Sequence, residues 1–447
     1  MDFTNKKVLV MGLARSGLAA IKVLHKLNAT IVLSESKDKE QLKPLELLES
    51  FNVEIVKQSK DVFRQDYDLC IKNPGIAFNS EFIKLLEERN IPVITEIELA
   101  FLVSKPQNYI AITGTNGKTT TTTLVYELLK KQFGDKAHLC GNIGTPLCDI
   151  VLSENLMEEE GHYLALEISN AQLVNIDKFK PKIATILNLT PDHIDFMGSL
   201  DFYYYSKTLI YKNMIDNDIF LLNNDDNTIK EYVEKYPIKC KISSFSLENE
   251  KADSYISDDY IYVDNQKILP LSSVKLVGKH NLQNIMVAVS CVKKLGVTNE
   301  NILEVISSFT GVEHRLEFVK EIDKVKYYND SKATNTDATI TALKSFDKGV
   351  ILLVGGFEKG LDMKPLQPYL SCVKKVIGFG ASGKRLVEDL VGKQGIVVEN
   401  LKQAVFIAKD IAIENDVVLL SPTTSSFDQY SCFEERGKHF KEIVNSL

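Results

Sequence analysis

Residues 111–125 read AITGTNGKTTTTTLV, and this stretch decides the fold that we predict for the middle of the chain. Its first residues continue an apolar run that is typical of a buried strand. Gly114, Gly117 and Lys118 follow, ahead of a segment with helical character. A strand, a glycine-rich loop and a helix in this order can cradle phosphate groups. The strict pattern G-x-x-x-x-G-K-[ST] is not met, because Ile112 stands where its first glycine belongs. We therefore interpret the stretch as a variant phosphate-binding loop.

The side chains of this loop have the chemistry that a nucleoside triphosphate requires. Lys118 would neutralise charge on the β- and γ-phosphates, and the Thr119 hydroxyl would bind Mg²⁺. Thr120 is expected to have a lesser part, and Thr121 to Thr123 are expected mostly to cap and pack the helix. The alternative is a glycine turn that binds no ligand. Backbone N–H groups around the phosphates would come from Gly114, Thr115, Asn116 and Gly117.

Composition narrows the class of protein. With 447 residues the chain is too long for a single hydrophobic core and fits two to four domains. A net charge of −7 argues against a nucleic-acid partner. The seven cysteines are scattered and never spaced C-x-x-C, which favours reduced thiols of a cytoplasmic protein over disulfides or a cysteine zinc site. The N-terminal sequence lacks the features of a signal peptide, and no run of 18 apolar residues occurs, so we expect no membrane span.

Three strand–turn–helix patterns predict an α/β protein with mostly parallel sheets. They start at the strand 7–11, at the stretch quoted above, and at the segment 349–360. The linker 105–108 and the glycine at 311 suggest the boundaries, and the polar block 247–268 predicts a small antiparallel excursion. The expected domains are a Rossmann-like N-terminal domain (1–103), a central P-loop NTPase-like domain (104–311) and a Rossmann-like C-terminal domain (312–447).

Three side chains downstream of the loop are candidates for metal or phosphate binding. Glu167 follows a predicted strand at 162–166, and His193 lies just beyond another at 183–187. In open α/β sheets ligands bind outside the carboxyl ends of the strands, which favours a functional interpretation of both. Lys207, by contrast, fits a solvated lysine on a helix when its neighbours alone are considered.

Sequence motifs also narrow the choice of nucleotide base. Residues 195–198 match the D-x-x-G element of guanine-nucleotide switches, but the chain lacks the [NT]-K-x-D element that reads guanine. ATP is therefore the favoured nucleotide.

At this point several motifs resemble those of the Mur ligases, the ATP-dependent amide-forming enzymes of peptidoglycan precursor synthesis. The motifs are GTNGKTT (114–120), GNIGTP (141–146), LEIS (166–169), DHID (192–195) and GKHNLQN (278–284). Two more segments are similar to the member of the family that adds D-glutamate: YYNDSKATNTDAT (327–339) and SPTTSSFDQYSCFEERG (421–437). The resemblance covers nearly the whole chain.

The resemblance implies a role for each matching residue. Lys118, His193 and Lys207 would be catalytic, and Lys207 would be carbamylated, which turns a cation into a metal-binding carboxylate. Two Mg²⁺ ions would be held by Thr119, Glu167, His193 and carbamylated Lys207. Further ATP contacts would come from Asn281 and Asn284 at the adenine and from Arg315 and Asp330. The D-glutamate pocket would contain Lys332, Thr334, Lys359, Ser426 and Phe433.

The N-terminal domain is the least regular part of the pattern. The segment 12–17 resembles a dinucleotide fingerprint, G-x-G-x-x-G, but Ala14 replaces the middle glycine. Taken alone, this domain could bind NAD. The resemblance implies instead that it binds the UDP end of the precursor, through Arg15, Ser16, Glu35 and Asn73, with Asn142 of the central domain contacting the UDP-sugar.

The function that the resemblance implies is a ligase. ATP would activate the carboxylate of UDP-N-acetylmuramoyl-L-alanine as an acyl phosphate, and the amine of D-glutamate would displace phosphate. Two alternatives are a folylpolyglutamate synthase-type ligase and a non-catalytic ATP-binding regulator. We expect a cytoplasmic monomer with small-molecule substrates, ATP and two Mg²⁺ ions, and neither nucleic acid nor membrane as a partner.

Overall fold

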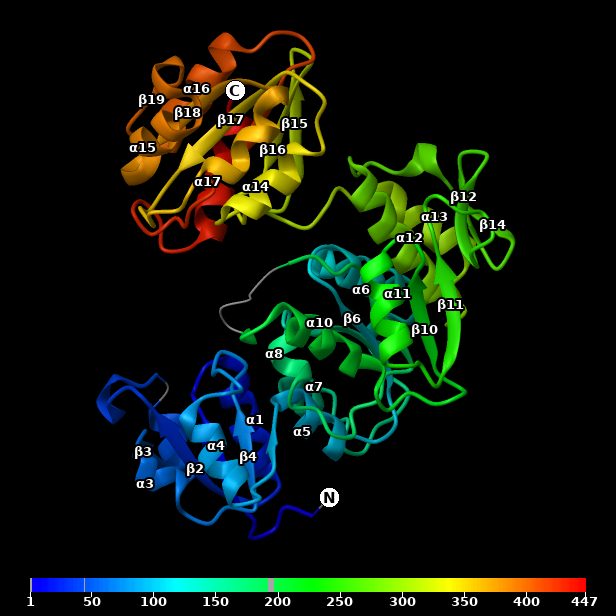
Figure 1. Ribbon diagram of the computed structural model, residues 1–447, viewed down its shortest axis with the longest axis vertical. Coiled ribbons are helices and arrows are strands. Elements are labelled where there is room, and N and C mark those ends of the chain that lie inside the picture. Colours follow the sequence, from blue (N-terminus) through cyan, green and yellow to red (C-terminus); the bar gives the residue numbers. More distant parts are fainter. Residues whose placement is uncertain (1, 44, 192–196) are drawn as a thin grey trace. The chain divides into compact units, whose positions relative to one another are not determined.

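The computed structural model describes residues 2–43, 45–191 and 197–447 (Figure 1). The chain divides into two compact units. One comprises Met1–Ser273 with Gln283–Ser307, and the other comprises Val274–Leu282 with Ser308–Leu447. The first unit contains two sheets and the second contains one. The prediction of an α/β protein with three mostly parallel sheets is confirmed, whereas the domain boundaries after residues 103 and 311 stay predictions.

The first sheet has five parallel strands in the order β3–β2–β1–β4–β5, which is the order of the first five strands of the six-stranded doubly wound nucleotide-binding fold. Its strands are β1 (Lys7–Met11), β2 (Thr30–Glu35), β3 (Glu54–Lys57), β4 (Leu69–Lys72) and β5 (Val93–Ile94). Its helices are α1 (Arg15–Lys26), α2 (Leu45–Ser50), α3 (Lys60–Phe63), α4 (Glu81–Glu88) and α5 (Glu96–Val103).

Both faces of this sheet are covered, because successive side chains of a strand point to opposite faces. Val8 and Val10 of β1 belong to the apolar cluster that contains α1. Leu9 and Met11 belong to the cluster that contains α3 and α4. The uninterrupted apolar run of β1 is thus explained by burial on both sides.

The second sheet has nine strands in the order β14–β13–β12–β11–β10–β9–β6–β8–β7. Its strands are β6 (Asn108–Thr113), β7 (Ala137–Gly141), β8 (Tyr163–Glu167), β9 (Ile183–Ile186), β10 (Ile219–Asn223), β11 (Lys241–Phe245), β12 (Ser254–Ser257), β13 (Tyr260–Val263) and β14 (Gln266–Pro270). Its helices are α6 (Lys118–Phe133), α7 (Leu147–Ser153), α8 (Asn170–Leu173), α10 (Leu200–Thr208), α11 (Asn227–Lys235), α12 (Lys279–Lys293) and α13 (Asn299–Ser308). Strands β12 to β14 pair antiparallel, which confirms the excursion predicted for the polar block 247–268.

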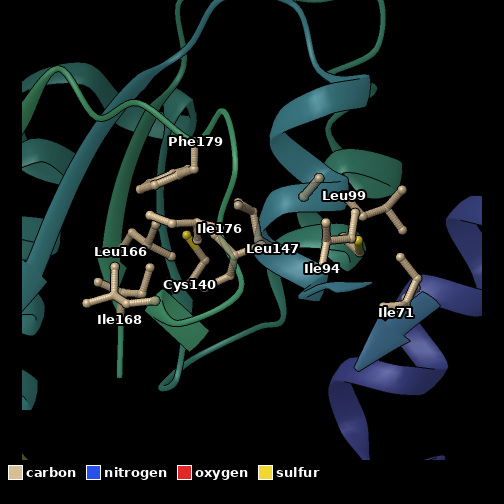
Figure 2. Packing of buried hydrophobic residues seen from close by; sticks show 14 of the residues in the cluster. Ile71, Ile94, Leu99, Cys140, Leu147, Leu166, Ile168, Ile176 and Phe179 are labelled. Carbon is tan, nitrogen blue, oxygen red and sulfur yellow. The ribbon is translucent and has the colours of Figure 1, made fainter. Parts of the chain in front are cut away.

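The two sheets of the first unit share one apolar core. Figure 2 shows Ile71 of β4 at one end of this core and Leu166 of β8 and Phe179 towards the other, with Leu99 of α5 and Leu147 of α7 between them. Polar contacts join the same parts of the chain. The buried Glu98 carboxylate on α5 accepts hydrogen bonds from the backbone N–H groups of residues 177–179.

The sheet of the second unit has the order β15–β16–β20–β17–β18–β19, with only the β15–β16 pair antiparallel. Its strands are β15 (Glu317–Ile322), β16 (Val325–Asn329), β17 (Val350–Gly355), β18 (Val373–Phe379), β19 (Ile396–Val397) and β20 (Val417–Leu420). Residues of α14 (Thr336–Leu343) and α15 (Gly380–Val391) belong to the apolar cluster on one face, and residues of α16 (Leu401–Ile411) and α17 (Phe433–Asn445) to that on the other.

Short 3-10 helices complete the chain: η1 (Lys39–Gln41), η2 (Gly134–Lys136), η3 (Leu209–Tyr211), η4 (Leu271–Ser273), η5 (Lys364–Cys372) and η6 (Gly392–Gln394). Among the described residues, no helix is long and apolar enough to cross a membrane.

Candidate active site

The phosphate loop connects β6 to α6 at the carboxyl end of the central strands. Gly114 and Gly117 both have a positive φ, at +149° and +82°, which a residue with a side chain adopts only with strain. A Cβ on Gly117 would also lie 2.4 Å from Oδ1 of Asn284. Ile112 is fully buried within β6, so the position of the missing first glycine is occupied by a core residue of the strand. Both positions at which the loop backbone needs a positive φ are therefore glycines, although the strict sequence pattern is not met.

The segment after β9 holds this loop in place. Backbone N–H of Thr115 donates to the carbonyl oxygen of Asn188, and that of Asn116 donates to Asn188 Oδ1 at 2.8 Å. The Thr115 hydroxyl donates to the Thr190 carbonyl oxygen at 3.1 Å and contacts the Tyr203 hydroxyl at the same distance. The loop is therefore fixed by contacts with β9 and α10.

Lys118 and Lys207 converge on one backbone carbonyl. Lys118 is the first residue of α6, and its Nζ donates to the carbonyl oxygens of Gly114 and Thr115, both at 2.8 Å. Lys207 Nζ donates to the same Gly114 oxygen at 3.0 Å and lies 4.7 Å from the ring centroid of Tyr203. The interpretation of Lys207 as a solvated helix lysine is wrong, because its side chain is 1% exposed and belongs to the loop's surroundings.

The threonines of α6 divide into two groups. Thr119 and Thr120 are buried in the first turn, where helix N–H groups have no partner within the helix. Thr121 donates its hydroxyl to Asn284 Oδ1 at 3.2 Å, and Thr122 donates to the Lys118 carbonyl oxygen at 2.8 Å. Thr121 and Thr122 are thus engaged in packing contacts, as expected.

Glu167 ends β8 beside the loop and carries an unsatisfied oxygen. Its Oε1 accepts from Asn142 Nδ2 at 2.7 Å. Its Oε2 is buried and has no hydrogen-bond partner among the described residues. A buried carboxylate oxygen without a donor is costly unless a cation or water satisfies it. Together with the Thr119 hydroxyl, this oxygen fits a hard divalent cation such as Mg²⁺, which prefers oxygen ligands. His193, the other predicted ligand, lies outside the described residues.

The glycine turn between β1 and α1 has the conformation predicted for a nucleotide-binding turn. Gly12 has a φ of +82°, and a Cβ on Gly17 would lie 2.0 Å from the Gly12 carbonyl oxygen. Glu35 Oε2 accepts the backbone N–H of Leu13 at 2.8 Å, and its Oε1 accepts that of Ser36. Partial burial works against ionisation of Glu35, but these backbone bonds outweigh it and lower the pKa.

The other residues predicted to contact UDP lie around this turn. Asn73 Nδ2 donates to the Ser16 hydroxyl at 3.3 Å. Arg15, the first residue of α1, donates through Nη2 to the carbonyl oxygen of Gly144 in the loop that also contains Asn142. The structure thus brings together, in one unit, the residues that sequence analysis assigned to the UDP-sugar.

Helix α12 contains both asparagines predicted to contact adenine. Asn284 is buried against the phosphate loop, as its contacts with Gly117 and Thr121 show. Asn281 donates through Nδ2 to the Val277 carbonyl oxygen at 2.8 Å. The contacts of both asparagines with adenine stay predictions.

In the second unit, Asp330 follows β16 and is buried. Its Oδ1 accepts from the backbone N–H of Leu316 and its Oδ2 from the Ser421 hydroxyl at 2.8 Å. Burial raises the pKa of Asp330 to about 7, although these two bonds and the charges of Arg315 and Arg436 oppose the shift. A carboxyl group with this pKa can change protonation state near neutral pH.

The predicted amino-acid pocket is partly assembled in the same unit. Lys359 Nζ donates to the Thr334 carbonyl oxygen at 3.2 Å, and Lys332 Nζ lies 5.6 Å from the ring centroid of Phe433. Ser426 is buried, and its hydroxyl has no hydrogen-bond partner in the part of the chain that the structure describes. These groups offer two cations and a buried hydroxyl to a ligand.

Sequence analysis missed the buried guanidinium that supports this pocket. Arg436 of α17 is fully buried and donates to Ser331, to the Gly355 carbonyl oxygen and to the Thr424 carbonyl oxygen. Burial lowers its pKa to about 10, which leaves it charged at neutral pH. Its place in the sequence FEERG gave no sign of its burial, because two exposed carboxylates directly precede it.

Two family models match the chain. The model described as the Mur ligase middle domain matches residues 112–292, and the model described as the Mur ligase glutamate ligase domain matches residues 314–424. Both glycines of the phosphate loop and the predicted D-glutamate residues up to Lys359 fall inside these matches.

Curated relatives match over their full length. The UDP-N-acetylmuramoylalanine--D-glutamate ligase of Geobacillus sp. (strain WCH70) is 38% identical over 454 residues, which cover 100% of this chain and 98% of the relative. The enzyme of the same name from Bacillus subtilis (strain 168) is 40% identical over 448 residues, which cover 98% of this chain and 97% of the relative.

Solved structures show the same fold. The MurF ligase from Thermotoga maritima in complex with ADP is similar with a TM-score of 0.59 at 18% identity, covering 100% of this chain and 96% of that one. The UDP-N-acetylmuramate-alanine ligase MurC from the same organism has a TM-score of 0.55 at 19% identity, covering 99% and 100%.

Proposed function

The chain belongs to the Mur ligase family, and from this premise we propose that it joins D-glutamate to UDP-N-acetylmuramoyl-L-alanine with ATP, releasing ADP and phosphate. The names of its relatives supply the pair of substrates. The structural observation that supports ATP-dependent chemistry is the phosphate loop with Lys118 at its end and the unpartnered oxygen of Glu167 beside it. In this proposal the product is a peptidoglycan precursor.

The chemistry begins with activation of a carboxylate. Carboxylate and ammonium do not condense usefully in water, so the L-alanine carboxylate would attack the γ-phosphorus of ATP and ADP would leave. The amine of D-glutamate would then attack the carbonyl carbon of the acyl phosphate, lose a proton and expel phosphate. Phosphoryl transfer depends mainly on positioning and charge neutralisation. Lys118 is placed at the start of α6 to supply positive charge, together with the N-terminal end of that helix.

Thr119 and Glu167 are the described residues that would hold a magnesium ion, and the resemblance adds His193 and carbamylated Lys207 for a second. When bound, Mg²⁺ would neutralise phosphate charge and orient the reacting oxygens. The surroundings of Glu167 support this assignment, because Asn142 fixes one carboxylate oxygen and leaves the other without a protein donor among the described residues.

Carbamylation of Lys207 has a physical motive in this site. Lys118 and Lys207 both donate to the Gly114 carbonyl oxygen, so two ammonium groups would repel each other in a buried setting. Lys207 would first lose a proton, and its neutral amine would then add CO₂ at Nζ and release a second proton. An anion would thus replace one cation and turn repulsion into attraction. The carbamate nitrogen keeps one N–H, so its bond to Gly114 can persist.

The second unit is proposed to recognise D-glutamate. Glutamate has two carboxylates, and Lys332 and Lys359 offer two ammonium groups. A charge-assisted hydrogen bond of this kind contributes roughly 1.5–3 kcal/mol. Thr334, Ser426 and Phe433 would complete the pocket, and Arg315 and Asp330 would contact the nucleotide.

The first sheet is proposed to bind the uridine end of the precursor, through Arg15, Ser16, Glu35 and Asn73, with Asn142 near the sugar. Their contacts around the Gly12 turn support this assignment. A monomeric, cytoplasmic enzyme is part of the same proposal.

One experiment tests the reaction. Phosphate release from ATP is measured with UDP-N-acetylmuramoyl-L-alanine while only the amino acid is varied. The proposal requires release with D-glutamate and not with L-glutamate, L-alanine or a diamino acid. Release with L-glutamate and a pterin-linked acceptor would favour the folylpolyglutamate synthase-type ligase. ATP binding without release under any of these conditions would favour the non-catalytic regulator.

Lys207→Ala tests the carbamate. We expect this variant to lose nearly all turnover and to recover part of it when short carboxylates such as acetate are added, because they can replace the missing anion. Lys207→Arg is the matched control, since it keeps the positive charge and cannot form the same carbamate. Unimpaired turnover in Lys207→Arg would contradict the carbamate role.

A further inference from the structure

Three side chains with metal-binding atoms gather at the amino end of β7 and β8, away from the phosphate loop. They are His138, Glu154 and His162, and one ligand atom from each lies within 4.8 Å of the others. His138 is the second residue of β7, and His162 directly precedes β8, which pairs with β7 in parallel. Glu154 follows the last residue of α7. The distant spacing of these residues hid the cluster from sequence analysis.

The two imidazoles already face each other through their nitrogens. His138 Nε2 lies 2.9 Å from His162 Nδ1, and the rings are stacked with centroids 5.2 Å apart. Two histidine nitrogens bound to one tetrahedral Zn²⁺ are roughly 3.3 Å apart, given Zn–N bonds of about 2.0–2.1 Å. The separation of the two nitrogens is therefore within about 0.4 Å of the bound value, and both rings would turn so that their lone pairs converge on the ion.

Each ligand is attached to a backbone that is fixed independently. The N–H of His162 donates to Gln107 Oε1, and its carbonyl oxygen accepts from Asn108. The strand pairing between β7 and β8 fixes His138. The N–H of Glu154 donates to the Ile150 carbonyl oxygen at 3.0 Å. Ligands held by such supports lose little freedom when an ion binds.

A cavity of about 540 Å³ gives access to the cluster. His138 and Glu154 line it, whereas His162 is 9% exposed and does not. The cavity also contains the ion pair between Lys130 and Asp135, whose charges offset each other. An ion would enter from this side, with His162 behind it and one coordination position open to solvent.

We propose that His138, Glu154 and His162 bind a divalent transition-metal ion, with Zn²⁺ as the first candidate and water as the fourth ligand. Two imidazoles and one carboxylate suit Zn²⁺ and its neighbours and do not suit Mg²⁺. The site is distinct from the magnesium site of the proposed function, because Glu167 is five residues further along β8, about 16 Å for an extended strand. The ion would join the starts of two strands to the end of α7.

The test uses the full-length protein, stripped of metal with a chelator and kept in excess Mg²⁺ so that oxygen-rich sites are filled. Co²⁺ is the probe, because tetrahedral Co²⁺ absorbs strongly in the visible range. We expect one equivalent of Co²⁺ to produce this absorption and one equivalent of Zn²⁺ to remove it. Zn²⁺ should also raise Tm by a few degrees, since a ligand that binds only the folded state stabilises it.

Variants locate the site. His138→Gln and Glu154→Gln should each weaken Co²⁺ binding by at least about 100-fold, because loss of even a supporting contact to a metal ligand costs 10–100-fold. Glu154→Gln lies at a helix end and is partly exposed, so it keeps the test valid if His138→Gln fails to fold. His25→Gln is the matched control, since His25 lies on α1 and stacks on Phe51, which follows α2.

Three results would overturn the proposal. The first is no visible Co²⁺ absorption up to about 1 mM, which leaves the histidines as a hydrogen-bonded pair. The second is equal binding by the protein and by Glu154→Gln. The third is an absorption of thiolate–cobalt type that disappears when cysteines are blocked. Phosphate release with D-glutamate, measured on the same samples in Mg²⁺, keeps failure of this site separate from failure of the proposed function.

Discussion

The first unit uses a strand, a glycine turn and a helix twice, between β1 and α1 and between β6 and α6. In both cases a glycine with positive φ makes the turn, and a basic residue, Arg15 or Lys118, is the first residue of the helix. The two turns differ in their neighbouring carboxylate. Glu35 accepts the backbone N–H of Leu13 in its turn and that of its own neighbour Ser36, whereas one oxygen of Glu167 is bonded to Asn142 and the other is without a donor among the described residues.

The same local structure thus acquires different chemistry from the carboxylate beside it. A carboxylate that accepts a backbone N–H of the turn brings negative charge to that position, which favours a hydroxyl or N–H group of a sugar or base beside it over a phosphate group. A carboxylate with an unpartnered buried oxygen beside a lysine suits a metal–phosphate complex. Substitutions at matched positions of the two turns test this difference.

The largest effect is expected at the two basic residues. Lys118→Met should lower kcat by about 1000-fold, because it removes a charge aimed at the transferred phosphoryl group. Arg15→Met should act mainly on the KM for the nucleotide-sugar, by about tenfold. Steady-state kinetics with each substrate varied in turn measure both. A similar loss of kcat in the two variants would show that the turns share one role.

The next effect concerns the glycines. A Cβ at residue 17 meets a backbone oxygen at 2.0 Å, so Gly17→Ala should destabilise the first unit by about 3 kcal/mol. Gly117→Ala should cost about 1–2 kcal/mol for its positive φ, because the atom it meets belongs to the Asn284 side chain, which can move. Thermal unfolding of both variants shows which one is less stable. A lower Tm for Gly117→Ala than for Gly17→Ala would contradict this prediction.

The third effect concerns the two carboxylates. Glu167→Gln should raise the Mg²⁺ concentration required for half-maximal turnover by about 10–100-fold. Glu35→Gln is the matched control and should leave the Mg²⁺ requirement unchanged. Turnover is measured across a Mg²⁺ titration at saturating ATP, and equal shifts in the two variants would contradict the metal role of Glu167.

The smallest effect is a pH dependence from Glu35. Its pKa is lowered in the folded protein, so its contribution to stability is present above its ordinary value of 4.5 and is lost as the pH falls through the lowered pKa. The group is only partly buried and solvent screens its interactions, so the change should stay below about 1 kcal/mol. Glu35→Gln should flatten this part of the curve of Tm against pH. An unaltered curve would mean that the Leu13 contact does not persist in solution.

Local patterns made much of the fold predictable. The run KVLVM predicted β1 at its observed bounds, and the phosphate loop was recognised although its first glycine is missing. These features depend on neighbours in the sequence. The order of the strands depends instead on contacts between distant segments. The contacts of Thr115 with Thr190, for example, exist because β9 lies next to β6.

The parts of the site that neighbouring residues could not predict are those that tertiary structure creates. Lys207 was assigned its role through the resemblance alone, because nothing in its neighbours indicates that α10 places it beside the Gly114 carbonyl oxygen. Arg436 and the His138 cluster are likewise ordinary in sequence and become distinctive only through burial and convergence. The residue types can be read from the sequence, but their burial and contacts cannot.

The buried guanidinium of Arg436 has a consequence for the order of events during synthesis. The backbone carbonyls that it joins belong to Ser331, Gly355 and Thr424, and all three precede α17 in the chain. They are therefore synthesised before their common donor. We therefore expect the loops around Ser331, Gly355 and Thr424 in a nascent chain to stay sensitive to proteases until α17 emerges, and to become resistant in a single late step.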